Sequence, residues 1–171
     1  YLFMAGGCTG TTDCTTPVGT VSSAPLDANG SVGTWTDQAA LPSATGWGKL
    51  AAAGGSLYYI GGQNAAGTAQ TAVYYTTPSG GTVGSWSTAS NGLPNARSKF
   101  GVASWNNRLY AVGGAGSGTG CTASNVCSTI YVSPQLSSGG NIGSAWSTSS
   151  TSLPVARSGV ASIAYANNLY A

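Results

Sequence analysis

The stretch NNRLYAVGGAGSGTG, residues 106–120, runs from an Asn-Asn pair through a half-apolar segment into a double glycine and then a series of small residues. The same order occurs in GSLYYIGGQNAAGT at residues 55–68 and in YLFMAGGCTGTT at residues 1–12. A further NNLYA occupies residues 167–171. Self-similarity of this kind predicts a chain built of repeated structural units.

The spacing between landmarks indicates which parts of each unit are rigid. Pro42 to Leu57, Pro94 to Leu109 and Pro154 to Leu169 each span 15 residues, and Trp35, Trp86 and Trp146 stand six or seven residues before the Leu-Pro dipeptides. The segment between the double glycine and the next β-branched residue takes 14, 11 or 16 residues. Because loops vary in length and packed segments do not, we expect a loop after each double glycine.

Composition and spacing together predict an all-β protein. The chain of 171 residues has 27 Gly and few helix formers, while its 42% hydrophobic content argues against a disordered chain. We expect a first strand at residues 98–105, a second at 108–114, a third at 71–77 or 128–134, and a fourth that begins near 81–86. Four antiparallel strands in about 52 to 60 residues are typical of one β-propeller blade.

These strands predict a single domain of consecutive units. The units cover residues 1–56, 57–108 and 109–168 approximately, and a further unit starts at residues 169–171. The expected strand count is 3 + 8 + 2 = 13, which corresponds to about three blades. Because propellers typically close with about four to eight blades, we expect the chain to be part of a longer array or to self-associate.

The landmarks of each unit resemble kelch repeats. A double glycine closes the second strand, an aromatic residue occupies the third, a tryptophan follows, and an arginine comes shortly after Leu-Pro. The resemblance extends over essentially the whole chain and implies a β-propeller of four-stranded kelch-like blades. It assigns blade-structural roles to the repeated residues, which are Gly6, Gly7, Gly61, Gly62, Gly113, Gly114, Trp35, Trp86, Trp146, Arg97 and Arg157.

The first copy departs from this pattern. Thr45 stands where the other copies have Arg97 and Arg157, and Ser22 stands where the third strand otherwise carries a tyrosine. In kelch-like proteins these positions usually connect neighbouring blades. A buried aromatic side chain contributes about 1.5–3 kcal/mol by burial, so we expect the first unit either to pack more loosely or to have a different neighbour, with its cysteine loop as one candidate for local compensation.

Four cysteines form two pairs with the same C-x5-C spacing. Cys8 and Cys14 follow the first double glycine, and Cys121 and Cys127 follow the third. Matched pairs in matched loops predict two local disulfides and an oxidising, extracellular or cell-surface compartment. Four free buried thiols are the alternative. A zinc site is disfavoured because the pairs lack C-x2-C spacing and the chain has no His.

Several classes of function are excluded or disfavoured by composition. Five isolated basic residues form no patch for nucleic acid, and no apolar segment approaches the roughly 20 residues that span a bilayer. The chain has no His and no Glu, and its acids Asp13, Asp27 and Asp37 are read as turn or surface residues. We therefore expect no enzyme activity, no catalytic residues, no metal site and no cofactor.

Two classes of function remain. The first is an extracellular binding or adhesion module that presents its variable loops, residues 8–21 and 114–130, to a protein or glycan partner. The second is a structural or filament-forming surface protein. Trp47 and Trp105 lie outside the repeated tryptophan position and are candidates for ligand contact, with blade packing as the alternative.

Overall fold

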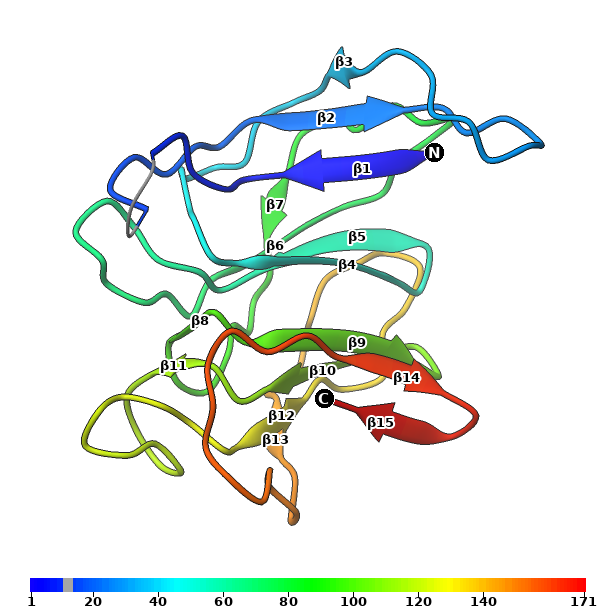
Figure 1. Ribbon diagram of the computed structural model, residues 1–171. Helices are drawn as coiled ribbons and strands as arrows, with labels where there is room; N and C mark the ends of the chain where they lie inside the picture. Colours follow the sequence, from blue (N-terminus) through cyan, green and yellow to red (C-terminus); the bar gives the residue numbers. More distant parts are fainter. Residues whose placement is uncertain (11–13) are drawn as a thin grey trace.

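The computed structural model describes residues 1–10 and 14–171, and every regular element in this part of the chain is a β-strand (Figure 1). The strands are β1 (Leu2–Ala5), β2 (Val21–Ala24), β3 (Thr36–Asp37), β4 (Lys49–Ala53), β5 (Ser56–Ile60), β6 (Val73–Thr76), β7 (Ser87–Thr88), β8 (Arg97–Ser98), β9 (Gly101–Trp105), β10 (Arg108–Val112), β11 (Ala115–Gly116), β12 (Ile130–Val132), β13 (Ser147–Thr148), β14 (Ile163–Tyr165) and β15 (Asn168–Tyr170). The predicted all-β fold is confirmed.

The described residues form five antiparallel sheets, of which four follow one another along the chain and a short fifth pairs β8 with β11. The first has the order β1-β2-β3, the second β4-β5-β6-β7, the third β9-β10-β12-β13, and the last is the hairpin β14-β15. These sheets contain three, four, four and two strands, which is the grouping that the repeat spacing predicts. Figure 1 shows the first three of these sheets stacked from top to bottom, with the β14–β15 hairpin beside the third, and the described sheets do not close into a ring.

Two strand positions differ from the prediction. The first strand of the third sheet was expected at residues 98–105, but β8 and β9 are separate because Lys99 has a left-handed backbone with a φ of 54°. The fourth strand was expected near residues 81–86, but β7 begins after Trp86. The preceding residues instead form a tight turn, in which Ser79 and Thr82 exchange backbone hydrogen bonds.

The double glycines connect each sheet to the segment that enters the next one. The amide of Gly7 donates to the carbonyl of Thr45, Gly62 to Arg97, and Gly114 to Arg157, over 3.2, 2.8 and 2.9 Å. Gly62 has a φ of 98°, and a Cβ added there would lie 2.6 Å from the Gly46 carbonyl. Glycine is required because other residues fit neither this backbone conformation nor this close approach.

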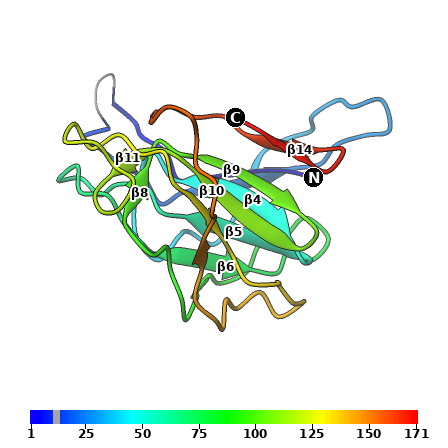
Figure 2. The same cartoon turned by 90° about the horizontal axis from the view of Figure 1, so that it is seen from below.

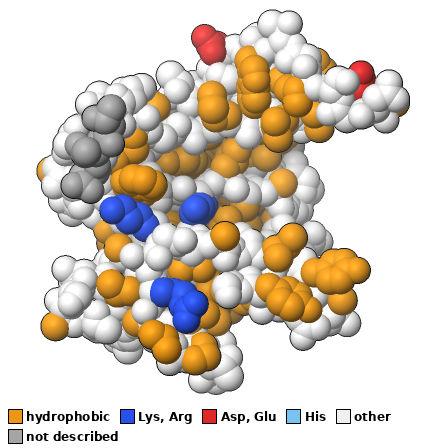
Figure 3. All heavy atoms as spheres, viewed as in Figure 1, with side chains coloured by type: hydrophobic (Ala, Val, Ile, Leu, Met, Phe, Trp, Pro, Cys, Tyr) orange, Lys and Arg blue, Asp and Glu red, His pale blue; other side chains and the backbone are white. Residues whose placement is uncertain are grey.

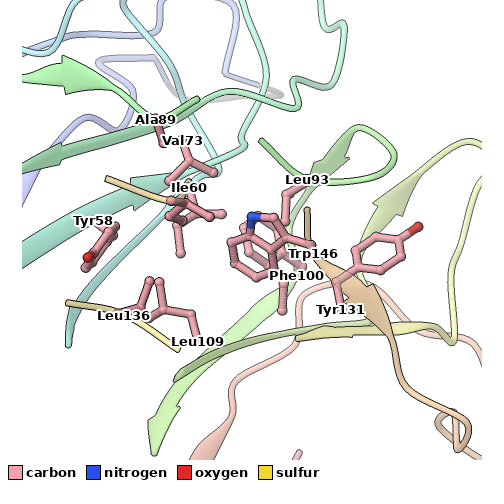
Figure 4. Close-up of a cluster of buried hydrophobic side chains, with 12 residues drawn as sticks. Tyr58, Ile60, Val73, Ala89, Leu93, Phe100, Leu109, Tyr131, Leu136 and Trp146 are labelled. Atoms are coloured by element: carbon pink, nitrogen blue, oxygen red, sulfur yellow. The ribbon is translucent and has the colours of Figure 1, made fainter. Parts of the chain in front are cut away.

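Two hydrophobic clusters fill the spaces between sheets. The cluster between the first and second sheets contains Val21, Leu57, Tyr59 and Trp86. The larger one lies between the second and third sheets, and Figure 4 shows its side chains converging from both, including Ile60, Phe100, Leu109, Tyr131 and Trp146. Because alternate residues of β5 point into different clusters, the second sheet is covered on both faces.

Candidate functional site

A cavity of about 400 Å³ lies where the loops after two double glycines meet. It is lined by residues of three segments, Gln63, Gly67, Thr68 and Ala69 from one loop, Ala96, Ser98 and Lys99 from the segment after Leu-Pro, and Ala115, Gly116, Ser117 and Asn125 from the other loop. Figure 2 shows β8, β11 and these loops together at one end of the sheets. The lining offers hydroxyl, amide and backbone groups and one cation, Lys99.

Local hydrogen bonds hold both loops of this cavity. The Asn64 side-chain oxygen accepts from the amides of Ala66 and Thr68, at 3.1 and 3.0 Å. In the other loop the Gly116 amide donates to the Asn125 carbonyl over 2.9 Å. Side-chain caps of this kind order a short loop without secondary structure, so the cavity wall is built in advance of any ligand.

Both predicted cysteine pairs are present as disulfides. Cys8 is bonded to Cys14 and Cys121 to Cys127, with Cα–Cα distances of 5.2 and 3.9 Å, and no free cysteine remains. Disulfides of this number in a small protein are typical of an oxidising environment. The second disulfide closes part of the loop that lines the cavity, and in the chain-entropy model this constraint contributes about 2.4 kcal/mol.

The first disulfide occupies space beside the altered first repeat. A Cβ built on Gly46 would collide with the sulfurs of Cys14 and Cys8. The two other repeats carry Ser98 and Ser158 at the position of Gly46. The neighbouring Thr45 is buried, and its carbonyl accepts a 2.7 Å hydrogen bond from the hydroxyl of Tyr59. This hydrogen bond connects the second sheet to the segment that carries Thr45 in place of the repeat arginine.

Arg97 is 1% exposed and forms hydrogen bonds to uncharged groups only. Its Nη1 donates to the carbonyls of Ala96 and Ser117, both at 2.9 Å, and its Nη2 donates to the hydroxyls of Thr129 and Tyr131, at 2.9 and 2.8 Å. Burial lowers the pKa of its guanidinium from the ordinary value. Its Nε is buried and has no hydrogen-bond partner among the described residues.

The main chain of Arg97 forms hydrogen bonds to a different part of the molecule from its side chain. Its amide donates to the Gln70 carbonyl over 3.1 Å and its carbonyl accepts from Gly62, so the main chain is bonded to the second sheet's loop. Of its side-chain acceptors, Tyr131 lies in β12 of the third sheet and Thr129 directly precedes that strand. The residue therefore connects two consecutive sheets, whereas Arg157 is exposed and its Nε reaches only the Val155 carbonyl at 3.4 Å.

The repeated tryptophans occupy different environments. Trp86 and Trp146 are 8% and 6% exposed, and the indole N–H of Trp86 donates to the Ala39 carbonyl over 3.0 Å. Trp35 is 44% exposed. A tryptophan at this position packs toward the preceding sheet, so Trp35 lies on the open face of the first sheet.

Both tryptophans outside the repeat position are partly exposed, at 43% for Trp47 and 42% for Trp105. They lie at opposite ends of the strands. Trp105 ends β9 and lines a separate cavity with Tyr110 and Leu169. Trp47 follows Gly46, which exchanges both backbone hydrogen bonds with Gln63 of the loop-lined cavity, at 3.0 and 2.7 Å. Of the two candidates, Trp47 lies beside the cavity.

A left-handed backbone recurs at one repeat position that was not predicted from the sequence. Trp47, Lys99 and Gly159 each stand six residues after the Leu of Leu-Pro, and their φ angles are 57°, 54° and 71°. The Lys99 amide donates to the Trp47 carbonyl over 3.0 Å, and the Gly159 amide donates to the Lys99 carbonyl over 2.7 Å. A left-handed backbone costs a residue other than glycine about 1–2 kcal/mol, so two of three copies retain an unfavourable residue here. The glycine in the third copy, Gly159, was the feature of the sequence from which this backbone conformation could have been predicted.

The two described carboxylates lie away from this cavity. Asp27 accepts hydrogen bonds from the amides of Asn29 and Ser31, both at 2.8 Å, and the bond from Ser31 is the main cause of its lowered pKa. Asp37 accepts from the Ser22 hydroxyl at 3.1 Å. Asp13 lies outside the described residues. Figure 3 shows the acidic side chains at the upper edge of the molecule and Lys and Arg side chains near the middle.

In the described part of the chain, no group of three or more His, Cys, Asp or Glu side chains is placed to hold a metal ion. Within the same residues, no helix has the length and apolar character needed to cross a membrane.

The fold defines a class: an all-β protein of consecutive, stacked, antiparallel sheets of up to four strands. No protein-family model matches the chain, and no curated protein matches it. Among solved structures 137 chains match, and one described as "Structure of YjhT" has a TM-score of 0.64 and 19% identity over 90% of this chain. This chain spans 44% of that protein's length. Such a likeness concerns the fold alone, because one fold supports many functions.

Proposed function

We propose that the chain is a kelch-repeat β-propeller segment that acts outside the cell as a non-catalytic binding module. The observation that carries this proposal is the cavity of about 400 Å³ where two post-double-glycine loops and the segment after Leu-Pro meet. Loops that vary in length on a rigid sheet scaffold are where binding sites typically occur. The double glycines, the buried Arg97 and the buried repeat tryptophans support the kelch resemblance.

The extracellular assignment rests on the disulfides. Both pairs lie in loops at the end of the sheets that bears the cavity, and one of them closes part of the cavity wall. A cytosolic glutathione pool keeps such thiols reduced, so two disulfides are typical of an oxidising compartment. This chemistry supports an extracellular site of action for the proposed binding surface.

A steric block of the cavity tests the binding function. Thr68 is exposed and lines the cavity, so Thr68→Trp should fill it without disturbing the core. Thr34→Trp is the matched control, since Thr34 is also exposed and lies between β2 and β3. We expect binding on a glycan and protein array to disappear for Thr68→Trp and to persist for Thr34→Trp. Equal binding by both variants would contradict a role for the cavity.

A second candidate function is self-association as a structural unit. Large apolar side chains remain exposed on the two outermost sheets, namely Leu2, Met4 and Trp35 on one and Ile163, Tyr165 and Tyr170 on the other. Exposed apolar patches of this kind mark interaction surfaces. Sedimentation analysis at increasing protein concentration tests this candidate. Oligomers that form in the wild-type protein and are absent in Met4→Asp and Ile163→Asp would support it, and a monomer at all concentrations would exclude it.

A further inference from the structure

We propose that the cavity binds an acidic carbohydrate, with Lys99 as the contact for its carboxylate and Trp47 as the surface for a sugar ring. This inference rests on the proposed binding function and names the ligand class of the same site. Its starting point is the repeated left-handed position, where Gly159 is the residue that the backbone favours and where Trp47 and Lys99 are present instead.

The two side chains contact each other beside the cavity, which Lys99 lines and Trp47 does not. The Lys99 Nζ lies 5.0 Å from the centroid of the Trp47 ring, and the two residues are joined by the hydrogen bond from the Lys99 amide to the Trp47 carbonyl. Lys99 lines the cavity, and Trp47 remains 43% exposed. Backbone strain that persists at adjacent, contacting positions is typical of functional sites, because the side chains are retained despite their cost.

The charge around the cavity favours an anion. Lys99 lies on its wall, and the buried guanidinium of Arg97 lies behind the wall, where it is bonded to the carbonyls of Ala96 and Ser117. Its four hydrogen-bond acceptors are neutral, so this charge has no compensating carboxylate among them. One positive group on the wall and a second behind it attract an anionic group more strongly than either would in open water.

The remaining lining suits a polyhydroxylated ligand. Ser98, Ser117, Thr68 and Asn125 present hydroxyl and amide groups that can donate to or accept from sugar hydroxyls. An exposed indole face packs well against the C–H face of a sugar ring, since the indole buries apolar surface without demanding a hydrogen bond there. A cation, an aromatic face and neutral polar groups together fit a uronic acid unit better than a neutral sugar or an apolar ligand.

The test uses the full chain and two probes, hexagalacturonate and the neutral hexasaccharide cellohexaose. By titration calorimetry we expect hexagalacturonate to bind at low salt, to weaken as salt rises, and to bind at least about tenfold more tightly than cellohexaose. Lys99→Gly and Trp47→Gly should each weaken hexagalacturonate binding at least about tenfold. Arg108→Gln, which removes a charge from the β9–β10 hairpin at the opposite end, should leave binding unchanged.

Thermal unfolding of the same variants separates a binding role from a structural one. Because glycine adopts the left-handed backbone without strain, Lys99→Gly should keep the Tm within about 2 °C of wild type or raise it. A fall of several degrees with unchanged affinity would show that Lys99 is structural and would overturn the proposal. Absence of hexagalacturonate binding to the wild-type chain would also overturn it, while the Thr68→Trp array experiment would still decide the binding function separately.

Discussion

The inner and outer sheets of this molecule carry the same repeat residues in opposite environments. Trp86 and Trp146 are buried between sheets, whereas Trp35 lies on the open face of the first sheet. Arg97 is enclosed by Tyr131 of β12 and by Thr129 directly before that strand, while Arg157 precedes a two-stranded hairpin and lies exposed. The repeat residues therefore contribute to stability through their contacts with a neighbouring strand or sheet. Where no such strand or sheet contacts the residue in the structure, its contribution is small.

The tryptophans provide the largest expected contrast. Trp86→Ala should lower the free energy of unfolding by about 3–5 kcal/mol, because it leaves a cavity between two sheets and removes the donor to the Ala39 carbonyl. Trp35→Ala should cost less than about 1 kcal/mol, since its ring is already partly in water. Urea unfolding followed by circular dichroism measures both. Equal losses would show that the exposed tryptophan is packed in solution.

The two repeat arginines should show the second-largest difference in stability. Arg97→Ala should cost about 3 kcal/mol, because it leaves a void and removes the donor to the buried hydroxyls of Thr129 and Tyr131. Arg157→Ala should change stability by no more than about 0.5 kcal/mol. Arg97→Lys is a useful control, since an ammonium cannot reproduce the planar fork and should recover little of the loss. If Arg97→Ala has the same urea midpoint of unfolding as the wild type, the proposed difference between the arginines of the inner and outer sheets is wrong.

Alkaline pH tests the contact between the first and second sheets. Burial raises the pKa of the Tyr59 hydroxyl to about 12, and this hydroxyl donates to the Thr45 carbonyl. Because the folded-state pKa lies above the unfolded value, the stabilisation is complete below about pH 10 and is lost as the pH rises through about 12. We expect stability to fall by about 1.4 kcal/mol per pH unit in this window from Tyr59 alone.

The control for this pH dependence is a tyrosine on an outer sheet. Tyr59→Phe should flatten the decline in urea stability between pH 10 and 12, while Tyr165→Phe should leave it as in wild type, since Tyr165 is exposed. A decline that is the same in Tyr59→Phe and in wild type would mean that this hydroxyl is ionised as readily in the folded chain as in the unfolded one.

The disulfides carry the smallest expected effect. Replacing either pair, Cys8 with Cys14 or Cys121 with Cys127, by two serines should cost about 2 kcal/mol, because each closes a loop of similar length. Peptide mapping without reductant should find both links within their own loops. A peptide joining Cys8 to Cys121, or free thiols in protein secreted from cells, would contradict both the pairing and the extracellular assignment.

Local patterns in the sequence were enough for the strands and for the cysteine pairs. The Leu-Pro and double-glycine spacings predicted four consecutive sheets of three, four, four and two strands, because these landmarks lie at strand ends where backbone conformation depends on the residue itself. They did not predict the small β8–β11 sheet. The fourth strand was placed too early, since the short turn at Ser79–Thr82 displaces it past Trp86. The Cys8–Cys14 and Cys121–Cys127 disulfides could be predicted because the two cysteines of each pair are only six residues apart, so their pairing depends on local chain geometry.

The candidate site could be predicted only in part. The sequence indicated that the loops after the double glycines and Trp47 were of interest, but it did not indicate that Lys99 lines the cavity and lies over Trp47. It also treated Arg97 and Arg157 as equivalent, and they are not. Spacing within a repeat is a local property that the chain encodes residue by residue. Burial, charge compensation and the meeting of two loops depend on which sheet lies next to which, and only the tertiary structure decides that.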